Sequence, residues 1–224
     1  RQGFMWFGTQ EGLNRFDGIS FKVYKKDLLN EGGLTNDAIF ALKEDKDGVI
    51  WIGTDNGVSL YDPKYEHFYD LELVVEDGLP GVGVVRSIIC DKENNMWLAL
   101  ENKGVFKVDE KRNVNFYSLK DYLSNGSGSI RDIVFDMDGN LWIATYQQGI
   151  LKLDIHTGKI SQILLTDYLK EASDNNVNGL CLWDSETLLI GSGYGMLKYD
   201  LRHDTLNLIV SKTQSGKKIF VRDI

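Results

Sequence analysis

The chain has 224 residues, a formal net charge of −8, 42% hydrophobic residues, two prolines and two cysteines. This length and composition predict one soluble domain with a sizeable core, and no apolar run approaches the eighteen or more residues of a membrane-spanning helix. The acidic balance argues against nucleic acid or an anionic membrane as the main partner, because both require a basic surface.

The first element, residues 1–27, is predicted to be a β-hairpin followed by one more strand. Its segment QGFMWFGTQEGLNRFD ends at Asp17 and has an apolar run around Trp6 before a glycine-containing turn. Such short apolar runs joined by turns are typical of antiparallel hairpins. The chain opens at Arg1, in the middle of this unit and without an initiator methionine, so we expect a fragment or a processed product.

The same hairpin returns more clearly in residues 44–62, EDKDGVIWIGTDNGVSLYD. The D-K-D-G segment 45–48 has the composition of a tight turn, in which carboxylates accept backbone N–H groups and glycine tolerates positive φ. The apolar run 49–54 predicts a strand covered on both faces. A second turn at 55–57 then leads into a partner strand at 58–62.

This unit recurs along the chain. Tryptophans at positions 6, 51, 97 and 142 are 45, 46 and 45 residues apart, and Leu189 takes the tryptophan position 47 residues later. Later copies end at Asp109, Asp154 and Asp200. A fixed period of this size indicates a repeat architecture.

Each repeat divides into four predicted strands, a to d. Strand a precedes the hairpin, b and c form it, and d follows the closing aspartate with the alternation and charge expected at an outer edge. The predicted a strands are 39–44, 85–90, 130–135 and 177–182, and the predicted d strands are 21–24, 68–73, 115–119, 160–165 and 206–210. Four antiparallel strands per repeat predict an all-β fold, a β-propeller with about five four-stranded blades.

The predicted blades are residues 1–27, 37–73, 84–119, 129–165 and 176–210, with the start of a further blade at 219–224. This inventory leaves two arrangements open. The last strand could complete the first blade and hide two sheet edges. Alternatively, an open arc from a larger ring would expose a strand edge and an apolar blade face at each end, which favours self-association.

The recurring residues have a structural interpretation. A tryptophan in strand b could stack on a sugar, but its recurrence inside apolar runs is what packing between blades requires. The aspartates of turns 45–48 and 136–139 resemble those of a calcium-binding loop, but both turns lack the distal glutamate of an EF-hand loop. We therefore expect their carboxylates to fix the turns. No phosphate loop or zinc spacing occurs, and no metal or cofactor is expected.

The cysteines are predicted to be buried free thiols. Cys90 and Cys181 fall in equivalent strands of copies two repeats apart, which places them beyond disulfide reach.

The repeat pattern resembles a known family. The pattern D-x-D-G-x-(hydrophobic)-W-(hydrophobic)-G/A-T-x-x-G-(hydrophobic)-x-x-(aromatic)-D is similar to the regulator propeller repeats in periplasmic sensors of Bacteroides-type hybrid two-component systems. Departures are confined to the fifth copy, where Leu189 replaces tryptophan and Trp183 replaces the leading aspartate.

The resemblance implies a larger receptor: two seven-bladed propellers, an immunoglobulin-like domain, a membrane span, a histidine kinase, a receiver and a DNA-binding domain. It implies that this chain is part of the first propeller, an open arc in a homodimeric receptor. The chain itself would not be an enzyme or contact nucleic acid. It would sense an oligosaccharide and control polysaccharide-utilisation genes. Two alternatives stay open: a propeller enzyme acting on glycans, such as a lyase or hydrolase, and an assembly module that binds no ligand.

Candidate ligand contacts come from positions that vary among repeats, because a scaffold position must repeat whereas a recognition position need not. In a propeller the b–c hairpin tips and the d–a connections share one face. Amides, carboxylates and aromatic rings at the tips suit carbohydrate hydroxyls and ring faces. These tip residues are Asp55, Asn56, Glu101, Asn102, Tyr146, Gln147, Gln148 and Tyr194.

A second candidate set lies near the start of strand a. Alignment of the repeats places Phe40, Arg86, Arg131, Asn178 and Arg222 at one register. Guanidinium groups here could bind the carboxylate or sulfate of an acidic glycan bidentately. Alternatively, the arginines pair with acidic residues of their own or the next blade, such as Asp132 or Asp223, and tie blades together.

Overall fold

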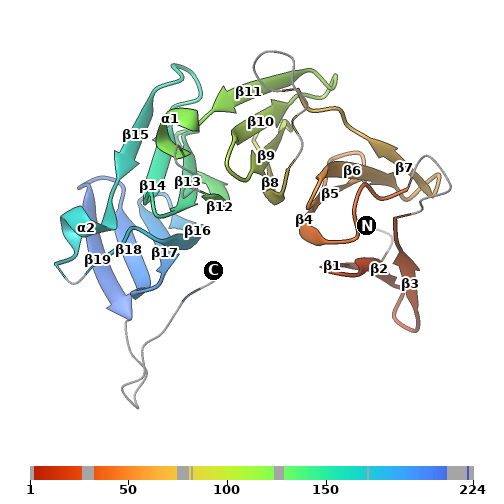
Figure 1. The fold of residues 1–224 in the computed structure, drawn as a ribbon, viewed down its shortest axis with the longest axis horizontal. Coiled ribbons are helices and arrows are strands. Elements are labelled where there is room, and N and C mark those ends of the chain that lie inside the picture. Colours follow the sequence, from red (N-terminus) through yellow and green to blue (C-terminus); the bar gives the residue numbers. More distant parts are fainter. Residues whose placement is uncertain are drawn as a thin grey trace. The chain divides into compact units, whose positions relative to one another are not determined.

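The structure is a computed structural model that describes residues 3–26, 33–74, 81, 83–123, 129–170, 172–210 and 221. The fold is all-β, as predicted. The described residues form five antiparallel sheets, one of three strands and four of four strands, and each sheet is a meander of consecutive strands, as in β-propeller blades (Figure 1). The chain divides into two compact units, Arg1–Ser118 and Leu119–Ile224, and each is described by itself.

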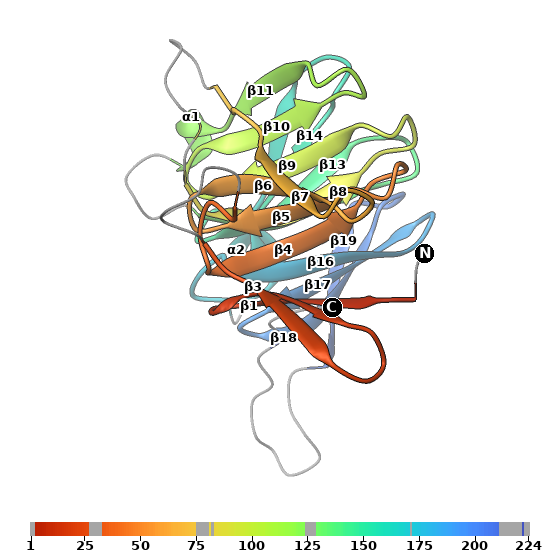
Figure 2. The ribbon, with the colours of Figure 1, turned by 90° about the vertical axis from the view of Figure 1, so that its right-hand side faces the viewer.

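The first unit contains three blades. The first blade is β1 (Met5–Thr9), β2 (Gly12–Phe16) and β3 (Phe21–Tyr24); the second is β4 (Ile39–Glu44), β5 (Ile50–Thr54), β6 (Gly57–Asp62) and β7 (His67–Asp70); the third is β8 (Val85–Cys90), β9 (Met96–Leu100), β10 (Gly104–Val108) and β11 (Val114–Ser118). Figure 2 shows β4, β5 and β6 side by side in the second blade.

The second unit contains two blades and two short helices. Its elements are α1 (Lys120–Leu123), β12 (Ser129–Phe135), β13 (Leu141–Tyr146), β14 (Ile150–Leu153), β15 (Ile160–Ile163), α2 (Leu165–Tyr168), β16 (Val177–Asp184), β17 (Thr187–Ser192), β18 (Gly195–Asp200) and β19 (Thr205–Val210). The strand orders are β12-β13-β14-β15 and β16-β17-β18-β19.

The predicted a strands 39–44 and 85–90 are confirmed, but three d strands end before their predicted last residue. That residue is Leu73, Leu119 or Leu165, and each side chain is buried in the connection to the next blade. Leu119 and Leu165 instead lie at or just before the start of a short helix. The apolar residue that ends the predicted strand therefore contributes to the core without extending the ladder.

The strand-b tryptophans are core residues, as predicted. Trp51, Trp97 and Trp142 are almost completely buried. Trp51 belongs to a cluster that joins the second and third blades, and Trp142 to one that joins the fourth and fifth. Burial of such large rings between sheets contributes apolar stabilisation to these two blade pairs.

Each of these indoles also has a specific polar partner. The Nε1–H of Trp51, Trp97 and Trp142 donates to the Oδ2 atom of Asp45, Asp91 and Asp136 at 2.9, 2.8 and 2.8 Å. The other carboxylate oxygen accepts backbone N–H groups of the a–b turn. The turn carboxylates are thus structural, and the described residues contain no cluster of three or more His, Cys, Asp or Glu side chains that could hold a metal ion.

The fifth blade lacks both members of this pair. Leu189 occupies the tryptophan position and Trp183 the aspartate position, where a bulge between Leu182 and Asp184 leaves the Trp183 side chain 70% exposed. Loss of the indole removes the need for a buried acceptor, so the two departures are physically coupled.

Both cysteines are free, as predicted, but they are only partly buried. Burial, assisted by the nearby Asp91 carboxylate, raises the pKa of the Cys90 thiol.

Neighbouring blades are joined by a recurring backbone hydrogen bond. The N–H of Gly12, Gly57 and Gly149, each at the end of a b–c turn, donates to the carbonyl of Asp37, Gly83 and Asn175 at 2.9, 2.8 and 2.9 Å. Each acceptor lies two residues before strand a of the following blade. The b–c turns and the d–a connections therefore share one end of each blade, as predicted.

The predicted inner strand at 219–224 lies outside the described residues except for Val221. Its N–H donates to the Ser192 carbonyl at 3.2 Å, beside the end of β17.

Candidate functional site

The strand-a position that was predicted to contact a ligand forms a β-bulge in every described inner strand. The pairing of strands a and b skips Phe40 in β4, Arg86 in β8, Arg131 in β12 and Asn178 in β16. A bulge adds one residue to a strand and re-aims its side chain away from the regular alternation. One side chain per blade is thereby separated from the repeating scaffold.

In the first unit the bulged arginine has a carboxylate partner, although its Nε, like that of Arg131, is buried without a hydrogen-bond partner. Arg86 Nη2 donates to Glu101 Oε2 at 3.0 Å, and both side chains are largely buried. The guanidinium carbon also lies 4.6 Å from the ring centre of Phe40, the bulged residue of the preceding blade. Arg86 therefore ties two blades together, as the structural alternative predicted, but its carboxylate partner comes from the b–c tip.

In the second unit the bulged arginine has an aromatic neighbour instead. The Arg131 guanidinium carbon lies 5.2 Å from the ring centre of Tyr146. No carboxylate of the described residues lies within ion-pairing distance of Arg131, and its Nε is buried without a hydrogen-bond partner.

Among the described residues, neither Arg86 nor Arg131 forms an ion pair with Asp132. Asp132 accepts the backbone N–H of Ile133 at 2.8 Å and that of Leu180, in the next blade, at 3.0 Å. The carboxylate is used to fix the bulge and to join the fourth and fifth blades. Asp223, the other predicted partner, lies outside the described residues.

Two further members of this register remain. The Asn178 side-chain amide donates to the Val221 carbonyl at 2.9 Å, so Asn178 contacts the segment that follows the fifth blade. Arg222 lies outside the described residues, and its role stays a prediction.

The b–c tips contact the bulged residues at a constant offset. Glu101 follows Arg86 by fifteen positions and Tyr146 follows Arg131 by fifteen, so in the third and fourth blades the first tip residue lies against the bulged side chain of its own blade. The structure thus joins the two predicted sets in each of these blades into one site.

The remaining tip residues divide into two groups. Tyr194 accepts the N–H groups of Ser173 and Asp174 through its hydroxyl, and therefore holds the d–a connection. Backbone atoms of Gln147 and Gln148 are likewise engaged, by the side chains of Asn176 and Gln162. Exposed side chains with no hydrogen bond recorded among the described residues are Asp55, Asn56, Asn102 and Gln147.

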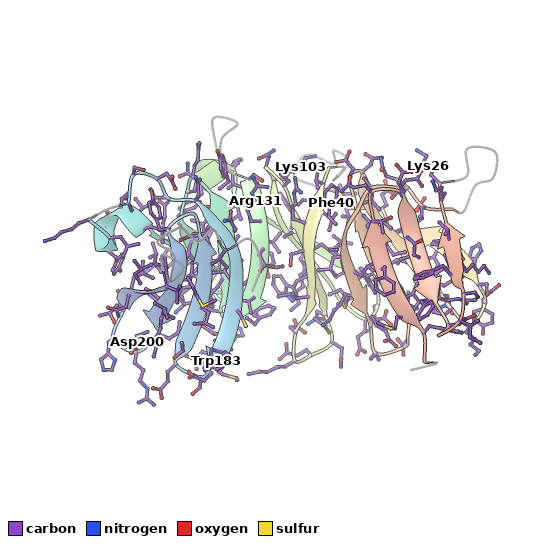
Figure 3. All side chains as sticks on the ribbon, turned by 90° about the horizontal axis from the view of Figure 1, so that it is seen from below. Lys26, Phe40, Lys103, Arg131, Trp183 and Asp200 are labelled. Atoms are coloured by element: carbon purple, nitrogen blue, oxygen red, sulfur yellow. The ribbon has the colours of Figure 1, made fainter. Side chains whose placement is uncertain are left out.

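Figure 3 shows the labelled residues at the two ends of the blades. In the first unit Lys26, Phe40 and Lys103 lie at the same end. In the second unit Arg131 lies at the end opposite Trp183 and Asp200. The bulged residues and the b–c tips therefore share an end within each unit.

A pocket of about 210 Å³ lies at the opposite end of the first and second blades. Trp6, Lys46, Asp47, Gly48 and Lys64 are among its lining residues, and none of the predicted ligand-contact residues lines it. Asp47 and Gly48 belong to the a–b turn, which the scaffold requires in other repeats. The bulge end, where residues vary between blades, is therefore the better candidate for recognition.

The aspartates that close strand c are the clearest electrostatic feature of that opposite end. The pKa values of Asp17, Asp109, Asp154 and Asp200 lie below the ordinary value because each carboxylate accepts hydrogen bonds in the c–d turn. Those hydrogen bonds account for the recurrence of aspartate at this position, so these groups are structural.

Two features escaped prediction from the sequence. The Asp–Trp hydrogen bond had a visible signal, because an aspartate precedes each fully buried tryptophan by six residues. The bulge had a weaker signal: phenylalanine, arginine (twice) and asparagine occupy one register inside otherwise apolar strands.

Comparisons with known proteins agree with this architecture. Residues 33–56 and 125–147 match the family model "Two component regulator propeller". No curated protein matches the sequence significantly. No described helix is long and apolar enough to cross a membrane.

Solved structures similar to the chain include three instructive cases. The extracellular domain of the hybrid two component system BT3049 from B. thetaiotaomicron has a TM-score of 0.79 and 21% identity, over 98% of this chain and 29% of that chain. The extracellular domain of the one component system BT4673 from B. thetaiotaomicron has a TM-score of 0.64 and 15% identity, over 99% of this chain and 36% of that chain. Virginiamycin B lyase from Staphylococcus aureus has a TM-score of 0.60 and 13% identity, over 91% of this chain and 68% of that chain.

At these identities the structural similarity shows the fold alone, and the chain spans about a third of the two B. thetaiotaomicron domains. The family model additionally matches the sequence at two of the five repeats, over the same residue pattern on which the resemblance was based. The chain is a β-propeller in which residues 33–56 and 125–147 match the two-component regulator propeller repeat.

Proposed function

We propose that the chain belongs to the periplasmic sensor region of a hybrid two-component system. The match to the regulator propeller model and the similarity to the extracellular domain of such a system support this function. The structural observation that carries it is the bulge in each described inner strand, which presents phenylalanine, arginine or asparagine on a constant scaffold and, in the third and fourth blades, lies beside a b–c tip residue. A surface built this way suits recognition of a ligand.

The proposed ligand is an oligosaccharide, and the proposed output is control of polysaccharide-utilisation genes through a histidine kinase. Exposed amides and a carboxylate at Asp55, Asn56, Asn102 and Gln147, with the ring of Tyr146, suit hydroxyl groups and sugar ring faces. Further blades, a second propeller and a homodimeric receptor complete the proposal.

A propeller enzyme is the second candidate, since virginiamycin B lyase shares the fold. Binding is favoured over catalysis because the bulged residues themselves are phenylalanine, arginine and asparagine, which are poor general acids, bases or nucleophiles at neutral pH. The carboxylate beside Arg86, that of Glu101, is already paired with it.

Calorimetry against a panel of neutral and acidic oligosaccharides tests this function. We expect saturable binding of at least one oligosaccharide without change in its mass. Release of shortened or unsaturated products would instead favour the enzyme, and absence of binding across the panel would favour an assembly module.

A further inference from the structure

We propose that Arg131 and Tyr146 form a binding site for an anionic group, a carboxylate or a sulfate, on the ligand. The proposal rests on the proposed sensor function for the saccharide that carries the group. It begins from a contrast between two equivalent positions, one in each compact unit. Arg86 has Glu101 at 3.0 Å, whereas Arg131 has no ion-pair partner among the described residues and faces the Tyr146 ring.

The electrostatic state of Arg131 is unusual for a partly buried arginine. Desolvation of a guanidinium is unfavourable unless a counter-charge or hydrogen bonds compensate it. A ring face offers only partial compensation. An anion bound at this position would supply the missing charge that Glu101 supplies in the first unit.

The accessible part of Arg131 fits this role. Its Nε is buried. The two terminal nitrogens are not buried and form no hydrogen bond with the described residues, so they remain available to a ligand. Two N–H groups in a planar fork bind a carboxylate or a sulfate bidentately. Tyr146 is 37% exposed, so its ring is available beside the fork.

The position of Arg131 is fixed by the backbone around it. Asp132 accepts N–H groups from Ile133 and from Leu180, so the bulge that carries Arg131 is attached to two blades. At the tip, the Asn176 side chain holds the Gln147 N–H at 2.9 Å. Arginine and tyrosine are therefore presented on a preorganised backbone, which lowers the entropic cost of binding.

The test compares three disaccharides on the full chain by calorimetry. One carries a uronate carboxylate, one an O-sulfate, and the third is their neutral parent. We expect the wild-type chain to bind one or both acidic forms at least tenfold more tightly than the neutral parent. Arg131→Gln should abolish this preference and leave the melting temperature within a few degrees. Arg131→Lys should retain part of it, because lysine keeps the charge but lacks the fork.

Arg112→Gln is the matched control. Arg112 also stacks on an aromatic ring, that of Trp51 at 4.7 Å, but it lies near Asp45 in the first unit and outside the proposed site. Its replacement removes one positive charge and should leave the preference for acidic disaccharides intact. Equal loss in Arg112→Gln and Arg131→Gln would show a general charge effect and overturn the proposal.

Inorganic sulfate, followed by the NMR signal of the Arg131 Nε–H group, separates this inference from the sensor function. A shift of that signal by sulfate, without binding of any disaccharide, supports the anion site and contradicts saccharide sensing. Neutral oligosaccharide binding that survives Arg131→Gln, with no preference for acidic forms, supports sensing and overturns the anion site. If neither sulfate nor any saccharide binds, the anion site is wrong.

Discussion

A buried indole N–H requires an acceptor, and in three blades an aspartate six residues earlier provides it. The carboxylate of Asp91 accepts not only the Trp97 indole but also N–H groups of its own turn. One side chain therefore closes the a–b turn and satisfies the core of the blade. This double role explains why aspartate and tryptophan occur together in the repeats and disappear together in the fifth.

Replacement of Asp91 by alanine should lower the free energy of unfolding by about 2–3 kcal/mol, because a buried donor loses a charged acceptor. Asp184→Ala is the control: this carboxylate accepts the Glu186 N–H in the fifth blade, where no indole depends on it. Denaturant unfolding of both variants measures the difference. Equal losses would show that the indole hydrogen bond contributes little.

Trp51→Ala should lower the free energy of unfolding by about 3–5 kcal/mol through lost apolar burial and the cavity it leaves. Asp55→Ala, at an exposed tip only four residues away, should change it by less than about 0.5 kcal/mol. Thermal melting of the two variants distinguishes core packing from a surface role. Unchanged melting of Trp51→Ala would contradict the assignment of tryptophan to the core between blades.

At the scale of the element, the c–d turns of the first, third, fourth and fifth blades are each closed by an aspartate with a lowered pKa. The largest cause is a hydrogen bond within the turn: from the Ser20 backbone to Asp17, from the Asn113 side chain to Asp109, from the Thr157 side chain to Asp154 and from the His203 backbone to Asp200. A carboxyl group with a lower pKa in the folded state stabilises the fold above its unfolded pKa.

We therefore expect stability to fall as the pH drops from about 4 through the lowered pKa values. The variant with asparagine at positions 17, 109, 154 and 200 should lose part of this dependence, because asparagine still accepts the turn hydrogen bonds but does not titrate. Melting temperatures of the wild type and the variant, measured from neutral to acidic pH, provide the comparison. Parallel curves would contradict the contribution of these turns.

The elements were predictable from the sequence to different degrees. Strands b and c carry long apolar runs between glycine turns, and the predicted hairpins agree with β5 and β6 to within one residue. The d strands were less predictable, since Leu119 and Leu165 have the same apolar character whether they extend a ladder or fill the core below a connection. The contacts Arg86–Glu101 and Arg131–Tyr146 could not be predicted from the sequence, because a bulge changes the direction of a side chain without changing the composition of the strand.

At the scale of the whole molecule, the first blade leaves one apolar face exposed among the described residues. Met5, Phe7 and Phe21 are 56%, 39% and 60% exposed, whereas Ile50 and Ile52, the equivalents of the first two in the second blade, are 5% and 0% exposed. The Phe21 ring contacts those of both Phe7 and Phe16. Such a contiguous apolar surface favours association in water.

The 224-residue chain should therefore self-associate with rising concentration, and the double variant Phe7→Lys/Phe21→Glu should reduce this association. Light scattering coupled to sizing measures the mass of both. Tyr65→Lys, at an exposed side chain in the c–d turn of the second blade, is the control and should leave association unchanged. A monomeric mass of the wild type at every concentration would contradict this expectation.

The recurring bulge also bears on how such a protein diversifies. A residue outside the pairing ladder can be exchanged without disturbing the hydrogen bonds on either side, and here phenylalanine, arginine and asparagine all occupy it on the same backbone. Positions 40, 86, 131 and 178, one in each of the second to fifth blades, can thus be varied independently by natural drift or in a combinatorial library. New specificity in this architecture requires no new loop.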